Sequence, residues 1–169
     1  MEVNYLNNWI RILEINGTST FSVEEARINF PEISEQNLNN TLYRFASNNR
    51  IVSVYKGFYV IIPPHYAAKG IVPPTYYIDQ LMQYIDKPYY ISLLSAAEFF
   101  GAAHQRSQRF FVTTILPSTN VSKAKNKLLN WLFRKDLPEE FLLTKNSETG
   151  IIRFSNEELT AIDLVKYEK

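Results

Sequence analysis

The sequence predicts a mixed α/β (α+β) protein built from two parts. Hydrophobic residues make up 46% of the 169 residues and aromatic residues 14%, enough for a substantial core and against disorder. Apolar residues recur at helical spacing in some segments and form β-prone runs in others. Pro-Pro pairs stand at 63–64 and 73–74, and such pairs favour extended chain. We therefore expect a connector over 63–75 between a domain at 1–62 and another at 76–169.

The N-terminal part is predicted to begin with three short helices. The first is apolar at helical spacing over 3–13 and ends at Gly17. The second begins at Ser22, which has the spacing of a capping box to Glu25. The third begins after Ser34, which can cap it.

The third helix is predicted to have one apolar and one polar face. Its apolar stripe consists of Leu38, Leu42, Phe45 and Ala46. At 100° per residue, the opposite side carries Gln36, Asn40, Tyr43 and Ser47, with Asn37 and Arg44 on its flank.

Two short strands, 51–55 and 58–62, follow these helices and are joined at Lys56-Gly57. Three helices followed by a hairpin are typical of a winged helix-turn-helix, in which the third helix enters the major groove of DNA and the hairpin touches the backbone or the minor groove. Amide side chains pair with adenine and arginine pairs with guanine. The predicted DNA-binding residues are Gln36, Asn37, Asn40, Tyr43, Arg44, Ser47, Arg50 and Lys56. A polar helix face that is only solvated, and a winged helix that binds protein, are the alternatives.

The C-terminal part is predicted to be a small mixed α/β domain. The expected elements are helices at 76–84 and 89–103, strands at 110–116, 129–135, 140–145 and 150–154, and a final helix capped by Ser155. Asp79 and Asp163 fall within helices and are expected at surface or capping positions.

Charge is segregated along the chain, although the net charge is only +1. Residues 104–135 include seven Lys or Arg and no acidic residue. This run predicts a second surface for nucleic acid or for action on a partner protein, with loops that are only solvated as the alternative. Its candidate residues are His104, Arg106, Arg109, Lys123, Lys125 and Lys127.

The sequence offers little for catalysis. It has no phosphate-binding loop, no G-x-S-x-G elbow and no cysteine. His104 has no catalytic partner at neighbouring helical spacing, since Ser95 and Glu98 lie nine and six residues upstream. We predict no enzyme, no metal and no cofactor; a nucleic-acid-processing enzyme using 104–109 is the less favoured alternative. The lack of cysteine and of a signal peptide predicts a cytoplasmic protein.

Three blocks of sequence carry a resemblance to a known family. They are KGFYVIIPPHYAAKGIVPPTYYIDQLMQY at 56–84, PYYISLLSAAEFFGAAHQRSQRFFVTT at 88–114 and TGIIRFSNEELTAIDLVKY at 149–167. In order and spacing they resemble the AbiEi family of antitoxins and transcriptional regulators, from abortive-infection (type IV toxin-antitoxin) systems.

The resemblance implies a winged-helix domain that binds repeats in its own promoter and represses its operon, followed by an α/β antitoxin domain. It also implies that the chain counteracts a nucleotidyltransferase-like toxin without a stable complex. Family members continue past the last block with further helices, so the resemblance implies that this chain is either a fragment truncated at its C-terminus or a short member of the family. The operator, the toxin, the oligomeric state and the antitoxin surface stay open.

Overall fold

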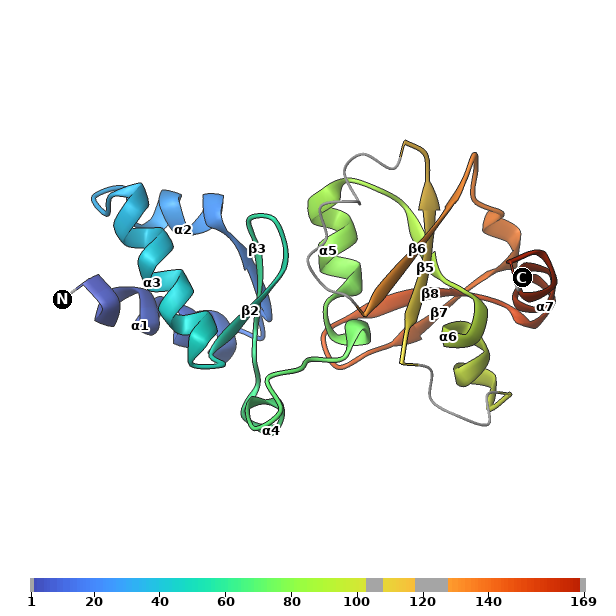
Figure 1. The fold of residues 1–169 in the computed structure, drawn as a ribbon, viewed down its shortest axis with the longest axis horizontal. Coiled ribbons are helices and arrows are strands. Elements are labelled where there is room, and N and C mark those ends of the chain that lie inside the picture. Colours follow the sequence, from blue (N-terminus) through green and yellow to red (C-terminus); the bar gives the residue numbers. More distant parts are fainter. Residues whose placement is uncertain (1, 103–107, 118–127, 168–169) are drawn as a thin grey trace. The chain divides into compact units, whose positions relative to one another are not determined.

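The chain divides into two compact units, Met1–Pro73 and Pro74–Lys169. The computed structural model describes residues 2–102, 108–117 and 128–167 (Figure 1). The division falls within the stretch 63–75, where we expected a connector. Part of that stretch is helical rather than extended, because Pro64 occupies the first turn of a short helix, α4 (Pro64–Ala67), where proline is tolerated.

The first unit combines helices with a three-stranded antiparallel sheet. Before α4 its elements are α1 (Glu2–Ile15), β1 (Thr20–Ser22), α2 (Val23–Asn29), α3 (Glu35–Ser47), β2 (Ile51–Tyr55) and β3 (Phe58–Ile61). The strands lie in the order β1-β3-β2. The three predicted helices and the hairpin are confirmed within one or two residues at each end. Strand β1 was not predicted, because three residues are too short to show an alternating pattern and form a strand only by pairing with β3.

The core of the first unit lies between its helices and its sheet. Leu6 and Ile10 of α1 and Leu42 of α3 are fully buried. Trp9 packs edge-on against Phe21 of β1, with ring centroids 5.2 Å apart. This packing fixes which side of each helix turns away from solvent.

Local hydrogen bonds set where these helices begin and end. The capping box at the start of α2 is confirmed: the Glu25 amide donates to Ser22 Oγ at 3.1 Å, and the Ser22 amide donates to a Glu25 carboxylate oxygen at 2.6 Å. Helix α1 ends at Ile15, and the turn that follows contains Gly17, whose φ of +75° suits glycine.

The second unit is a five-stranded mixed sheet with helices on both faces. Its elements are α5 (Ile78–Ile85), β4 (Tyr89–Ile91), α6 (Leu93–Ala97), β5 (Phe110–Ile115), β6 (Leu129–Arg134), β7 (Leu142–Asn146), β8 (Ile151–Ser155) and α7 (Glu157–Tyr167), with 3-10 turns at Pro74–Tyr76, Glu98–Phe100 and Glu139–Phe141. The strand order is β6-β5-β4-β8-β7. Strand β4 runs antiparallel to β5 and parallel to β8.

The helix predicted over 89–103 is wrong. Its first residues form the central strand β4, and helix α6 starts only after Ser92. Tyr89-Tyr90-Ile91 is a β-prone triplet buried on both faces between β5 and β8, and sheet pairing outweighs the helical spacing of the apolar residues around it. The turn from strand to helix passes through Leu93 at φ +51°.

Neighbouring residues of β4 hold the two helical layers. The Tyr89 hydroxyl donates to Asp79 of α5 at 3.1 Å, and the Tyr90 hydroxyl donates to Asp163 of α7 at 2.8 Å. Successive side chains of a strand point to opposite faces. Accordingly, Figure 1 shows α5 on one side of the sheet and α6 and α7 on the other.

The predicted cap of the last helix is one residue off. Ser155 belongs to β8, and the amide of Leu159 donates instead to Oδ1 of Asn156 at 2.9 Å. Among the described residues, no helix has the length and apolar character needed to cross a bilayer.

Replacing Leu42 by Ala is expected to lower the free energy of unfolding of the first unit by about 2–5 kcal/mol, because it leaves a cavity at a fully buried site. Urea unfolding monitored by Trp9 fluorescence, in a Trp131→Phe background, measures this change. Ile12→Ala on the exposed side of α1 is the control, and a destabilisation as large as that of Leu42→Ala would contradict the assigned core.

Candidate nucleic-acid interface

Helix α3 is held in the first unit by one apolar side. Leu38, Leu42 and Phe45 are buried, as predicted, and Ala46 is half-buried. Thr41 is also buried and extends the same side. The side chain of Ser34 caps the helix by accepting from the Asn37 amide at 3.3 Å. Because α3 is packed along its whole length, its opposite side must face away from the core.

That opposite side forms an exposed polar face on α3. It consists of the predicted residues Gln36, Asn37, Asn40, Tyr43, Arg44 and Ser47, all of which are exposed. The ring of Tyr43 is 75% exposed. The Ser47 hydroxyl donates to the Tyr43 carbonyl at 3.0 Å within the helix, so its proton is already engaged.

An ion pair lies at the start of this polar face. Arg27 of α2 donates to the Glu35 carboxylate of α3 at 2.6 Å. Both side chains are largely exposed, so the pair adds little to stability. Its effect is electrostatic, because the Arg27 guanidinium offsets the negative charge of Glu35, which is next to Gln36 in the sequence.

Lys56 stands at the exposed turn of the β2–β3 hairpin. The next residue, Gly57, adopts φ +75°, as the two-residue turn requires. The Gly57 carbonyl accepts from the Val23 amide at the start of α2 at 2.9 Å. The turn that carries Lys56 is therefore tied to the helical part of the unit.

Arg50 is placed differently from the other predicted contacts. Its guanidinium makes a bidentate ion pair with Glu14 near the end of α1, at 2.9 and 2.5 Å. Only 30% of the Arg50 side chain is exposed. We therefore assign Arg50 to holding α1 against the α3–β2 junction and leave it out of the interface.

Of the second predicted surface, the structure describes only Arg109, which is exposed just before β5. Its carbonyl accepts from Ser95 Oγ of α6 at 3.5 Å. His104, Arg106, Lys123, Lys125 and Lys127 lie outside the described residues.

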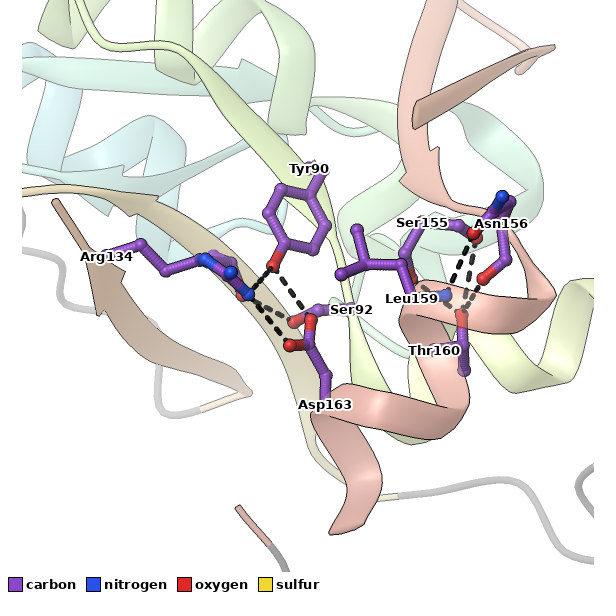
Figure 2. Close-up of polar contacts among 9 residues, drawn as sticks. Tyr90, Ser92, Arg134, Ser155, Asn156, Leu159, Thr160 and Asp163 are labelled. Atoms are coloured by element: carbon purple, nitrogen blue, oxygen red, sulfur yellow. Dashed lines mark hydrogen bonds and ion pairs between the residues drawn. The ribbon is translucent and has the colours of Figure 1, made fainter. Parts of the chain in front are cut away.

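The second unit contains a buried polar cluster centred on Asp163, shown in Figure 2. One Asp163 oxygen accepts from Tyr90 at 2.8 Å and the other accepts from Arg134 of β6 at 2.9 Å. The Arg134 guanidinium also lies 3.4 Å from the Tyr90 hydroxyl. Three elements, β4, β6 and α7, thus meet at one carboxylate.

Hydroxyl side chains extend this polar layer along the sheet. Thr113 of β5 donates to Ser92, the residue that follows β4, at 2.8 Å. Ser155 and Thr160 lie 2.7 Å apart, and the Thr160 hydroxyl is also 2.6 Å from the Asn156 carbonyl (Figure 2). Among the described residues no buried side-chain nitrogen or oxygen lacks a partner. A cluster so fully paired is suited to orienting α7 rather than to binding a ligand.

Asp163 was expected at a surface or capping position, and that prediction is wrong, since its side chain is 1% exposed. Ile162 and Val165 of α7 are apolar but exposed. The buried side is instead Leu159, Thr160 and Asp163. The available signal was the four-residue spacing from Leu159 to Asp163, which puts them on one helix face.

Burial and charge both alter the ionisation of the two central tyrosines. The pKa of the Tyr90 phenol lies above its ordinary value of 10.0. The first cause is burial, which disfavours the phenolate, and the second is the hydrogen bond that the phenol donates to Asp163. The pKa of Tyr89 is raised in the same way, by burial and then by the charge of Asp79. Both tyrosines therefore remain neutral hydrogen-bond donors at neutral pH.

The described residues contain no group of three or more His, Asp or Glu side chains that could hold a metal ion. No model of a known protein family matches the sequence, and no curated protein is similar to it at a significant level.

The free energy of unfolding of the second unit is expected to fall as the pH rises above 10. Tyr90 has a raised pKa in the folded state, so the phenol of the unfolded chain loses its proton at a lower pH. Above pH 10, each such tyrosine therefore lowers the free energy of unfolding by about 1.4 kcal/mol for every pH unit. Urea unfolding between pH 8 and 11, monitored by Trp131 fluorescence in a Trp9→Phe background, measures the slope. Tyr90→Phe should reduce it, and an unchanged slope would contradict this role of Tyr90.

Proposed function

We propose that the chain is a DNA-binding transcriptional regulator of the AbiEi antitoxin type, with its N-terminal unit acting as a winged helix-turn-helix. The observation that carries the proposal is the exposed polar face of α3, fixed by the packing of its apolar side in the core. The order of helices and the antiparallel sheet β1-β3-β2 support it, because they suit a third helix presented to a groove and a hairpin beside it.

In this proposal each side chain of α3 and the hairpin has a distinct task. Gln36, Asn37 and Asn40 contact base edges, which carry the sequence information. Arg44 contacts either a guanine or a phosphate, and Tyr43 reaches the backbone. Lys56, at the hairpin turn, contacts phosphate and adds affinity without selecting sequence.

The proposal includes the regulator's action on its own operon, and it places the protein in the cytoplasm. The regulator binds repeats in its own promoter, represses its operon and counteracts a nucleotidyltransferase-like toxin without a stable complex. The resemblance of the blocks at 88–114 and 149–167, which include β4, β5, β8 and α7, supports assigning the antitoxin role to the second unit. Catalysis is not part of the proposal.

A protein-binding adaptor is the second candidate. It is favoured by exposed apolar side chains on α1, where Tyr5, Ile12 and Ile15 are each more than half exposed. It is also favoured by the charge of the first unit, because residues 1–73 contain six basic and six acidic residues and so attract phosphate weakly. Capture of a partner protein by a chain that binds no duplex would support this candidate.

DNA binding is tested by a mobility-shift assay with the duplex upstream of the chain's own operon. Asn40→Ala removes a base-reading side chain, and Arg44→Ala removes a contact to guanine or phosphate. Each is expected to weaken specific binding by about 1–3 kcal/mol. Lys56→Ala should weaken binding to all duplexes alike. It should also reduce the slope of the logarithm of affinity against the logarithm of salt concentration by the amount that corresponds to about one contacted phosphate. Equal and weak binding to every duplex by the unmodified chain would overturn the proposal.

In this proposal the first unit represses the promoter and the second unit neutralises the toxin, so a substitution in one unit should impair only the task of that unit. Arg44→Ala is expected to release a reporter driven by the operon promoter while cells still survive co-expression of the neighbouring toxin. Charge reversal at Lys123, Lys125 and Lys127 tests whether the basic run serves toxin neutralisation or DNA binding. Death of Arg44→Ala cells on toxin co-expression, at normal protein abundance, would contradict assigning the antitoxin role to the second unit.

A further inference from the structure

We infer that α3 reads adenine: the exposed amides of Gln36, Asn37 and Asn40 select a site with adenines at neighbouring base pairs in the major groove. This inference rests on the proposed DNA binding and adds the class of sequence that is bound. It makes these three residues the determinants of specificity.

In the amino-terminal half of the polar face, the side chains that could contact base edges are mostly amides, and no arginine or lysine lies there. Gln36, Asn37 and Asn40 all lie in the first half of α3 and are exposed. An amide offers one acceptor and two donors, which match N6 and N7 of adenine in a bidentate pair. The residue that pairs with guanine in this way is arginine, and on this face Arg44 lies two turns beyond Gln36.

The acidic residue in this half is already engaged. A free carboxylate can accept from N4 of cytosine and so favour a G·C pair. Glu35 instead holds Arg27 of α2 at 2.6 Å. The ion pair offsets the charge of this carboxylate, although both side chains stay largely exposed. Exposed amides therefore outnumber this one carboxylate among the side chains in this half of α3 that can contact bases.

The spacing of the amides suits adjacent base pairs. A helix rises about 1.5 Å per residue, so Gln36 and Asn40 are offset by about 6 Å along the axis. Successive base pairs are about 3.4 Å apart, and the offset therefore corresponds to about two steps. Asn37 lies between them on the flank of the face. Together the three side chains span about three base pairs.

The charge of the first unit points to the same kind of recognition. Two of its six basic residues, Arg27 and Arg50, are held by Glu35 and Glu14. Few cations remain for phosphates, so base contacts must supply much of the preference for one site over bulk DNA.

The test is selection from a random duplex library with the full chain, followed by affinity measurements on the enriched duplex. The enriched site is expected to contain adenines at two or three neighbouring positions. Replacing those adenines by 7-deazaadenine, which lacks the N7 acceptor, should weaken binding between about five-fold and about a hundred-fold per position. Replacing the guanines of the same duplex by 7-deazaguanine should weaken binding less than replacing the adenines does.

Variants of α3 connect the adenines to the side chains. Asn40→Ala should abolish discrimination at one adenine and retain it at the others. Asn7→Ala, which removes an exposed amide from α1, is the matched control and should bind as the unmodified chain does.

The outcomes separate the two proposals. Selection of no duplex at all would overturn the proposed DNA binding itself. An enriched site read through guanine, with sensitivity to 7-deazaguanine and none to 7-deazaadenine, would overturn adenine readout while DNA binding stands.

Discussion

The burial of one side of α3 is the constraint on which the first unit and its proposed role depend. Leu38, Leu42 and Phe45 fill the space between α1 and the sheet, so the helix cannot rotate without exposing them. Its amides and Arg44 therefore face solvent as a consequence of the packing. The bidentate Arg50–Glu14 pair joins the end of α3 to the end of α1 and fixes the same arrangement.

The second unit is organised by a different constraint, the central position of β4. This three-residue strand carries hydrogen bonds to helices on both faces, through Tyr89 to α5 and Tyr90 to α7. The Asp163 carboxylate is stabilised in the interior because Tyr90 and Arg134 both pair with it. Removing one partner of such a buried group leaves the others unpaired, so the cluster is expected to behave as one cooperative element.

The sequence predicted the fold best where local signals agree with burial. The capping box at Ser22, the stripe of α3 and the hairpin around Gly57 each follow from neighbouring residues, and all are present. It failed where pairing between distant segments decides, as for β1 and for β4, which become strands through their partners in the sheet. The exposure of the α3 residues was predictable from helical spacing. The engagement of Arg50 by Glu14, 36 residues away, and the burial of Asp163 were not.

The surface proposed to meet DNA consists of the polar face of α3 and the hairpin turn. The most direct measurement of its role is an NMR titration of the isotope-labelled chain with the promoter duplex, following backbone and side-chain amide signals. We predict that the largest changes fall on the side-chain amides of Gln36, Asn37 and Asn40, with smaller ones at Lys56 and Gly57. Changes confined to the second unit, or to the exposed side of α1, would contradict this assignment.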